Sequence, residues 1–293
     1  MPSDKSLHNS NSGISVIYSA ENKMAYSSHS SKSIIYNRML FSGVSKSEPE
    51  LHSHDVCELI FLKKGDVSYI NDGKTYKLKK NTLVFTRPSE LHALVIDSNC
   101  DYDRYDVLFK EEILPPTLYQ KLTSENSVVD FEGNNIVKDI FKKMEFYCEN
   151  FEGEELDAIL LSLVHEVCCN LVLKQGKTIS SSGNSVVDRA IEYIDENLTT
   201  LESITKICDE LYIAKSHLHH LFKKHLNITP KQYLMSKRLI LAQREIYSGR
   251  RPTEVYEQFG FNDYSAFYRD FKKFFGYSPS KVGKVEITQE IKS

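Results

Sequence analysis

Two nine-residue segments near the C-terminus, 216–224 and 265–273, share the pattern Ser-x-(Leu/Phe)-x-x-x-Phe-Lys-Lys and begin 49 residues apart. In a helix, the apolar positions of each segment form one buried face. The opposite face then carries hydrogen-bond donors, aromatic rings and positive charge in both copies. A helix in the major groove of DNA requires such a face, so the repetition predicts two DNA-reading helices. For one copy alone, a solvated basic helix would be the better interpretation.

The exposed faces of the two expected helices suit contacts with bases and phosphates. Their side chains are Ser216, His219, His220 and Lys223 in the first copy, and Ser265, Tyr268, Arg269 and Lys272 in the second. Lys224 and Lys273 end the shared pattern and add positive charge beside these faces.

A long helix is expected between the two copies. Thr229 and Pro230 are a typical helix start, with a capping residue followed by proline at the first helical position. The helix can run to Ser248, where Gly249 ends it. Its roughly 20 residues rise about 1.5 Å each, which gives a length of about 30 Å. This length is close to the ~34 Å repeat of B-DNA, so the helix can place the two copies in successive major grooves.

A shorter helix precedes each copy, which predicts two helix-turn-helix units. The first is expected over about 201–210, after a capping box in which Glu202 follows Thr199 by three residues. The second is expected over 253–259 and ends at Gly260. Asn262 or Asp263 then caps the helix that follows.

The charge distribution supports this interpretation. The whole chain has a net charge of −3, but residues 214–284 contain 14 Lys and Arg against 5 Asp and Glu, a net of +9. Residues 1–183 contain 20 Lys and Arg against 26 Asp and Glu, a net of −6. The positive charge is therefore concentrated on the segment expected to contact phosphates.

The N-terminal half has the pattern of an all-β domain. Residues 1–30 are rich in Ser and Asn and predict a mobile arm with one strand near 14–18. Asn71, Asp72 and Gly73 predict a hairpin turn. Seven short strands suggest a barrel or a sandwich within residues 31–133. The expected strands are 34–41, 56–62, 67–70, 74–78, 82–86, 91–96 and 102–109.

Two helices are expected over 135–150 and 154–173, within a segment bounded at 134 and 175. The apolar stripe of the second helix is wider than one packing face requires, which favours packing against a second copy of the chain. Packing against the barrel is the alternative. Gly, Ser and Asn in 176–184 predict a flexible linker before the DNA-binding domain at 185–284, and 285–293 is a tail.

Residues 184–283 resemble the DNA-binding domain of AraC-type bacterial transcription regulators. The residues that carry the resemblance are Leu218 to Lys224, Tyr233, Arg238, Leu239, Ala242, Gly260, Phe261, Ser265, Phe267, Phe271, Lys272, Lys273, Gly276, Ser278 and Pro279. The resemblance implies that Ser216, His219 and His220 face bases in the first unit. It implies the same for Tyr264, Ser265, Tyr268 and Arg269 in the second. Family members often have Arg where this chain has His220.

His52, His54, Glu58 and Gly65, followed by Pro88 and His92, resemble the two motifs of cupins, which are jelly-roll barrels. A cupin-like ligand domain before the DNA-binding domain is an arrangement found in AraC-type regulators. Residues two apart on a strand share a face, so both His52 and His54 can point inward. We expect a polar cluster that binds a small ligand, with a metal site as the alternative. The candidate ligand-binding residues are His52, His54, Glu58, His92, Tyr36, Arg38, Tyr69 and Arg87.

The predicted fold is a cupin-like jelly-roll barrel, two helices and an all-α domain with two helix-turn-helix units. The predicted function is sequence-specific regulation of transcription by a cytoplasmic homodimer. It senses a small molecule, for which a sugar is the candidate, and needs no cofactor and has no enzymatic activity. The partners are promoter DNA, the effector and, for an activator, RNA polymerase. No membrane span is expected, because no run of about 18 apolar residues is present. The alternatives are a cupin-type metalloenzyme with a DNA-binding appendage and a ligand-independent regulator.

Overall fold

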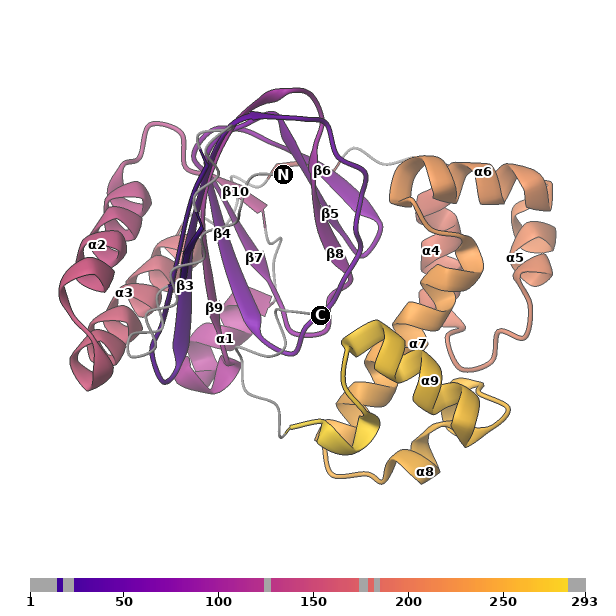
Figure 1. The fold of residues 1–293 in the computed structure, drawn as a ribbon. Helices are drawn as coiled ribbons and strands as arrows, with labels where there is room; N and C mark the ends of the chain where they lie inside the picture. Colours follow the sequence, from indigo (N-terminus) through magenta and orange to yellow (C-terminus); the bar gives the residue numbers. More distant parts are fainter. Residues whose placement is uncertain (1–14, 18–23, 124–127, 174–178, 182–184, 284–293) are drawn as a thin grey trace, which may run out of the picture.

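The computed structural model describes residues 15–17, 24–123, 128–173, 179–181 and 185–283. Within these residues, an N-terminal part built mainly of strands is followed by an all-helical part, and the two lie side by side (Figure 1). The predicted sequence of a β domain, two helices and an all-α domain is confirmed. The calls on 1–14, on most of the 176–184 linker and on the 285–293 tail lie outside the described residues.

The strands form two antiparallel sheets. The larger sheet has the order β1 (Ser15–Ile17), β2 (Met24–Ser30), β3 (Ile34–Val44), β9 (Cys100–Phe109), β4 (Cys57–Lys64), β7 (Thr82–Thr86) and β10 (Val128–Asp130). The smaller sheet has the order β6 (Lys74–Leu78), β5 (Val67–Asn71) and β8 (His92–Ile96). Apolar side chains of both sheets, including Ile60, Val67 and Val84, form one buried cluster between them. The two sheets thus form a barrel-like pair of layers with its own core.

The expected mobile arm is wrong for residues 24–30. These residues form β2, which pairs with β3 in continuous register from Met24 opposite Phe41 to Ser30 opposite Ile35. The segment has little hydrophobic alternation, so its sequence gives no strand signal. Its strand conformation comes from backbone hydrogen bonds to β3, which do not depend on side-chain identity.

Helices α1 (Pro116–Thr123), α2 (Ile136–Asn150) and α3 (Gly153–Leu173) belong to the same buried cluster as one face of the larger sheet. A 3-10 turn at Glu111–Ile113 precedes them. In α3, Leu156, Leu160, Leu163, Val164, Val167, Cys168 and Leu171 are buried. Ile159, Leu161 and Val172 also pack against this cluster. Much of the wide apolar stripe is therefore covered by the chain's own core.

The sequence analysis expected no membrane span, but helix α3 is long and apolar enough to cross a membrane by length and composition. Its mean hydropathy of 1.8 comes largely from the side chains that pack against the sheet. The core helix of a two-layer domain meets the same criterion.

The helical part contains α4 (Ser185–Glu196), α5 (Ile204–Leu211), α6 (Lys215–Leu226), α7 (Pro230–Tyr247), α8 (Pro252–Val255) and α9 (Tyr264–Phe275). Two 3-10 turns, Glu257–Phe259 and Pro279–Lys281, complete it. Thr229 and Gln232 form the capping box of α7, and Asp263 caps α9 by accepting a 2.7 Å hydrogen bond from the Ala266 amide. Gly260 ends the preceding turn at φ 74°. These helix starts and stops confirm the predictions.

The predicted start of the first helix is wrong. Helix α5 begins at Ile204 after Ser203, and no side chain caps it. Residues 197–201 instead form a turn, in which the amides of Thr200 and Leu201 donate to the Asn197 carbonyl. Leu201 is buried in the helical core, and Glu202 pairs with Lys206 rather than with the helix start. Tertiary contacts thus determine where α5 begins, and the local capping pattern predicted this start incorrectly.

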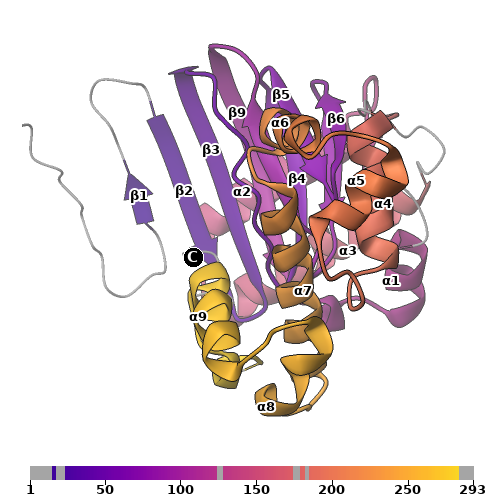
Figure 2. The same ribbon diagram turned by 90° about the vertical axis from the view of Figure 1, so that its right-hand side faces the viewer.

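The helical part packs against the barrel rather than standing apart from it (Figure 2). Ile70, Leu91 and Val95 of the barrel share one buried cluster with Val187 and Ile191 of α4. At either end of α7, Asn227 donates to the Pro49 carbonyl, and the Tyr247 hydroxyl donates to Glu112 at 3.2 Å. The barrel therefore contacts the end of the first recognition helix and the last residue of α7.

Candidate functional site

The first recognition helix, α6, presents the predicted face to solvent. Leu218 and Phe222 are fully buried, so the opposite side of the helix is free. On that side Ser216, His220, Lys223 and Lys224 are exposed, and His219 is half-buried. The structure also exposes His217, the second residue of the first repeated segment, which the sequence analysis did not assign to the DNA-reading face.

The second recognition helix, α9, has the same arrangement. Phe267, Phe271 and Phe275 are buried on one side. Ser265, Tyr268, Arg269, Lys272 and Lys273 are exposed on the other. Tyr264 is half-buried, and its ring lies 5.8 Å from that of Tyr256 and 6.3 Å from that of Tyr268. These ring contacts hold Tyr264 at the start of the helix, where a recognition helix contacts base edges.

One buried arginine connects the two units. Arg238 lies in the middle of α7, and its Nε and Nη2 donate 2.7 Å hydrogen bonds to the Leu198 and Leu201 carbonyls. Gly260 of the second unit lies so close that a Cβ there would be 2.7 Å from Arg238 Nη1. Helix α7 has 18 residues and a length of about 27 Å. A helix of this length joins the two units, and the placement of α6 and α9 in successive major grooves stays a prediction.

The barrel brings four of the predicted ligand residues together. His52 forms an isolated β-bridge with His92, the first residue of β8. The His92 ring centroid is 4.3 Å from that of His52 and 4.8 Å from that of His54. Glu58 Oε2 on β4 lies 3.3 Å from His92 Nε2 and 3.6 Å from His54 Nε2. We call these four residues the histidine cluster.

Backbone contacts determine which nitrogen of each ring carries hydrogen. The Nδ1 atoms of His52, His54 and His92 lie 2.9–3.0 Å from the carbonyls of Glu50, Val56 and Glu90. A carbonyl only accepts, so each Nδ1 donates and each neutral ring keeps a lone pair on Nε2. Ligand atoms of the three rings lie within 4.8 Å of one another. The cluster therefore collects acceptors that need a shared proton or cation.

Three buried atoms of the histidine cluster are the ones that would interact with such a proton or cation. His54 Nε2, His92 Nε2 and Glu58 Oε2 are buried and make no hydrogen bond of normal geometry. Burial opposes charge on both partners, yet Glu58 raises the pKa of His92, and the two histidines hold the pKa of Glu58 well below its ordinary range. His52 is the exposed member of the cluster, and partial desolvation of its ring and then His92 lower its pKa to about 4. Three imidazole nitrogens and a carboxylate would also fit zinc, iron, manganese or nickel.

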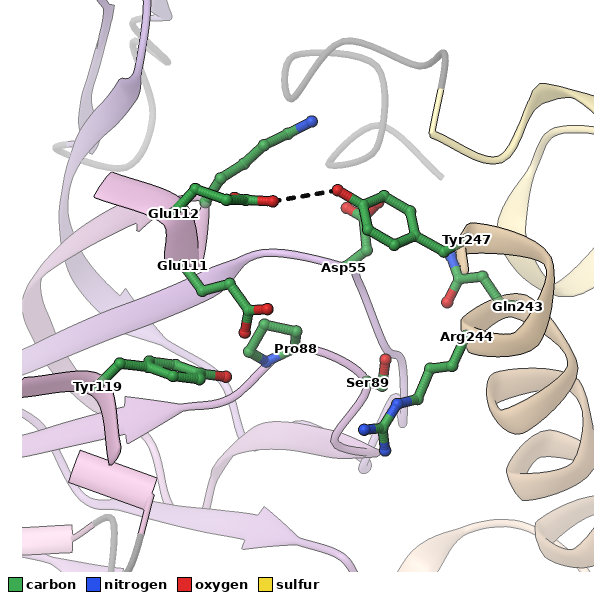
Figure 3. Close-up of a pocket in the computed structure, with 10 residues that line it drawn as sticks. Asp55, Pro88, Ser89, Glu111, Glu112, Tyr119, Gln243, Arg244 and Tyr247 are labelled. Atoms are coloured by element: carbon green, nitrogen blue, oxygen red, sulfur yellow. Dashed lines mark hydrogen bonds between the residues drawn. The ribbon is translucent and has the colours of Figure 1, made fainter. Parts of the chain in front are cut away.

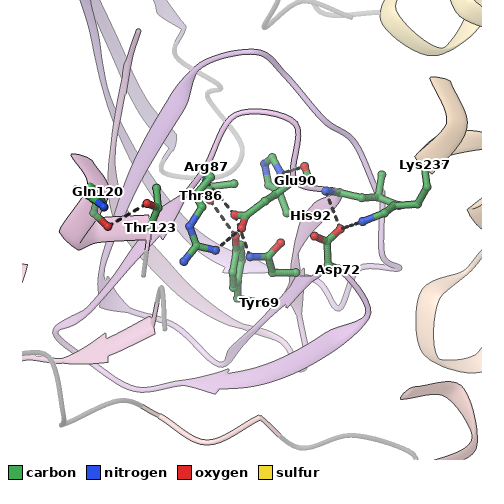
Figure 4. Close-up of polar contacts among 11 residues, drawn as sticks. Tyr69, Asp72, Thr86, Arg87, Glu90, His92, Gln120, Thr123 and Lys237 are labelled. Carbon is green, nitrogen blue, oxygen red and sulfur yellow. Dashed lines mark hydrogen bonds and ion pairs between the residues drawn. The ribbon is translucent and has the colours of Figure 1, made fainter. Parts of the chain in front are cut away.

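The other four predicted ligand residues are distributed differently. Tyr69 lies in the barrel, with its ring 6.3 Å from that of His92 and its hydroxyl 2.8 Å from Thr86 Oγ1. Arg87 pairs with Glu90 at 2.7 Å near the cluster (Figure 4). Tyr36 and Arg38 belong to the opposite face of the sheet, where Tyr36 donates to the Phe141 carbonyl and Arg38 pairs with Glu145 of α2. The structure does not bring these two to the cluster, because their strand positions face the helices.

Sequence reasoning missed a buried charged pair in the barrel. Arg104 and Asp106 on β9 lie 2.9 Å apart, and Asp106 is 2% exposed. Burial raises the pKa of Asp106 to about 7, with Glu58 acting in the same direction and Arg104 opposing. Charged residues occur on both faces of β9, so alternation in 100–109 could not identify the inward ones.

A cavity of about 250 Å³ lies between the barrel and the end of α7. Figure 3 shows Pro88, Ser89 and Tyr119 on its barrel side and Arg244 and Tyr247 on its helical side. None of the predicted site residues lines it. It is a space between the two parts of the chain rather than a continuation of the histidine cluster.

Comparisons with known proteins divide the chain where the fold does. Residues 45–166 match the AraC-like ligand binding domain family, and residues 207–284 match a helix-turn-helix domain family. The chain is 21% identical over 250 residues to the transcriptional activator RhaS of Enterobacter, covering 79% of this chain and 86% of RhaS. It is 30% identical over 113 residues to the probable regulator LumQ of Photobacterium leiognathi, covering 38% of this chain and 44% of LumQ.

One further relative and two solved structures are also similar to this chain. The raffinose operon regulatory protein RafR of Pediococcus pentosaceus is 27% identical over 132 residues, 44% of this chain and 48% of RafR. Among solved structures, CuxR superposes with a TM-score of 0.42 and 16% identity, covering 82% of this chain and 86% of CuxR. ToxT of Vibrio cholerae has a TM-score of 0.37 and 13% identity, covering 85% of this chain and 96% of ToxT.

A sheet-rich ligand-binding domain is followed along the chain by a domain with two exposed recognition helices. This combination defines a DNA-binding transcription regulator. The chain belongs to the AraC-type regulators, as the two domain matches and the homologues RhaS and RafR show.

Proposed function

We propose that the barrel senses its effector at the histidine cluster. The observation that carries this proposal is the set of buried Nε2 and Oε2 atoms on His54, Glu58 and His92, which contact one another at 3.3–3.6 Å but make no hydrogen bond of normal geometry. Buried polar groups without partners are costly, so the cluster gains stability from a ligand that supplies donors or positive charge. A sugar has the required hydroxyl donors, and the relative RafR is a raffinose operon regulatory protein. A divalent metal ion would satisfy the same lone pairs.

The proposed output is promoter binding by a homodimer, with activation through RNA polymerase, since the relative RhaS is a transcriptional activator. A DNA-binding regulator of this kind acts in the cytoplasm, and we propose no enzymatic activity, since the homologues are transcriptional regulators. For dimerisation, the outer face of α3 remains available, because Ala158, Ser162 and Cys169 are exposed along it. Leu160 and Leu163 are core residues and do not serve as contacts with a second copy.

The test of effector binding uses thermal unfolding of the full chain. Wild type and Glu58→Gln are each titrated with a panel of monosaccharides and, separately, with zinc, nickel and manganese salts. A ligand that binds the folded state raises the midpoint in proportion to the logarithm of its concentration. We expect the ligand to raise the unfolding midpoint of wild type. Glu58→Gln should need at least about tenfold more ligand for the same rise. Equal shifts for both proteins would contradict binding at the cluster.

The metal content of the purified protein separates the two ligand classes. A stoichiometric metal ion, lost in a His54→Gln, His92→Gln double variant, would identify the cluster as a metal site. Turnover of a substrate by that metal-loaded protein would support the metalloenzyme alternative. A protein that binds a monosaccharide without metal supports sugar sensing.

A further inference from the structure

The β5–β6 hairpin ends directly against the DNA-binding domain. Its turn residues Asp72 and Gly73 both have positive φ, 42° and 78°, as a tight hairpin turn requires. A Cβ on Gly73 would lie 1.9 Å from Ile191 Cδ1, so α4 occupies the space that a side chain would need. Ile191 is 5% exposed and belongs to the core of the helical part. The turn is therefore fitted to α4 and not only to its own strands.

A buried ion pair closes the same contact. Lys237 Nζ in the middle of α7 lies 2.8 Å from Asp72 Oδ1 and 3.5 Å from Asp195 of α4. The Lys237 side chain is 13% exposed, and although burial opposes its charge, Asp72 and Asp195 raise its pKa. A buried lysine depends on such partners, because the loss of one leaves a poorly compensated charge. We call the contact of Asp72 and Gly73 with Ile191, Asp195 and Lys237 the hairpin contact.

The hairpin contact is joined to the histidine cluster by a short chain of hydrogen bonds (Figure 4). The Asp72 amide donates to the Leu91 carbonyl at 2.9 Å, and the Leu91 amide donates to Asp72 Oδ1 at 3.3 Å. This carboxylate oxygen is the one that accepts from Lys237. Leu91 precedes His92 directly, and Asn71 is the register partner of His92. His92 is therefore one peptide bond away from the residue that holds Asp72 toward Lys237.

We propose that the hairpin contact restrains the DNA-binding domain by holding it against the acidic barrel. Residues 1–183 have a net charge of −6, and their repulsion of phosphates opposes binding while the two parts are docked. Release of the contact moves the barrel away from the duplex and raises DNA affinity. A ligand at the histidine cluster controls this release through Leu91 and Asp72, a step that rests on the proposed sensing function. The restraint itself does not depend on any ligand.

The experiment uses a steric variant with a matched control in the full chain. Gly73→Ala introduces a Cβ against Ile191, whereas Gly133→Ala has almost the same φ, 76°, with nothing within 4 Å. The control therefore carries the left-handed backbone strain without the clash. Ile191→Val removes the Cδ1 atom that the new Cβ meets and serves as the rescue in the Gly73→Ala background. Asp72→Asn keeps a residue that tolerates positive φ and removes the ion pair.

Two readouts are measured for each variant. Hydrogen exchange of the α4 amides and the radius of gyration from small-angle X-ray scattering report docking. Fluorescence anisotropy with a random-sequence duplex of about 30 base pairs reports DNA affinity at fixed salt. We expect Gly73→Ala and Asp72→Asn to increase α4 exchange, enlarge the radius of gyration and raise DNA affinity about fivefold or more. Gly133→Ala should match wild type, and Ile191→Val should restore docking in Gly73→Ala.

The proposal is overturned if the variants undock and DNA affinity stays unchanged or falls. It is also overturned if Gly73→Ala and Gly133→Ala behave alike, because strain rather than the contact would then be responsible. Neither readout uses an effector, so failure of effector sensing leaves these outcomes unaffected. Conversely, a monosaccharide or metal ion can bind at the histidine cluster while the hairpin contact proves irrelevant to DNA affinity.

Discussion

Lys237 of the DNA-binding domain and Asp72 of the barrel lie 2.8 Å apart, although 165 residues separate them in the chain. This ion pair lies midway along α7, between the Asn227 and Tyr247 contacts with the barrel. Both recognition faces nevertheless remain exposed. Any effect of the barrel on DNA binding therefore acts through charge and orientation rather than by covering these faces.

The positive segment predicts steep salt dependence of DNA binding. Residues 214–284 have a net charge of +9, and each neutralised phosphate releases counterions. With about four phosphates contacted, affinity should fall about 100-fold between 50 and 200 mM salt. Fluorescence anisotropy over this range measures the slope. A flat dependence would mean that the positive segment does not contact the phosphates.

Arg269 is predicted to contact a base. It is exposed on α9, at a position to which the resemblance assigns a base contact. Arg269→Ala should cost about 1–3 kcal/mol on the operator and much less on random DNA. Lys272→Ala is the control, since a phosphate contact weakens binding to both and lowers the salt slope by about one. Equal losses for Arg269→Ala on both DNAs would reassign it to a phosphate.

Arg238 is predicted to stabilise the DNA-binding domain through its two carbonyl contacts. Lysine cannot reproduce the planar fork that reaches both Leu198 and Leu201. Arg238→Lys should therefore destabilise this domain by about 2 kcal/mol or more. Urea unfolding, followed by α-helical circular dichroism, measures the change. Arg251→Lys, at an exposed pair with Glu254, should cost almost nothing.

Asp106 predicts a specific dependence of stability on pH. Burial raises its pKa to about 7, above the ordinary value of about 3.9 in the unfolded chain. The folded state therefore binds more protons between these values, so its contribution to stability is lost as pH rises from about 4 to about 7. Asp106→Asn should remove this slope, whatever its effect on absolute stability. Identical slopes for both proteins in urea unfolding at pH 4.5, 6 and 7.5 would contradict the assignment.

Dimerisation through the outer face of α3 predicts that a charge there separates the protomers. Ser162 is exposed and bonds only to the Ala158 carbonyl, so Ser162→Arg should leave the fold intact. Sedimentation velocity of the full chain at micromolar concentration measures the oligomeric state. Ser45→Arg, on the exposed loop after β3, is the matched control. The prediction is wrong if the wild-type chain sediments as a monomer. It is also wrong if the Ser162→Arg variant still sediments as a dimer.

Local sequence alone determined the helical domain and most of the strands. The caps at Thr229 and Asp263, the stop at Gly260 and the repeated recognition pattern depend on contacts within a few residues. The resemblance to cupin motifs also identified His52, His54, Glu58 and His92, which the structure brings together. These features are encoded locally, and the structure reproduces them.

Only the tertiary structure decided which side chains meet across distant elements. It turned residues 24–30 into a strand through pairing with β3, and it covered the apolar stripe of α3 with the barrel's own sheet. It placed Tyr36 and Arg38 against α2 and brought Asp72 to Lys237. The docking of the two domains has no local signal, because its energy comes from surfaces that are far apart in the chain.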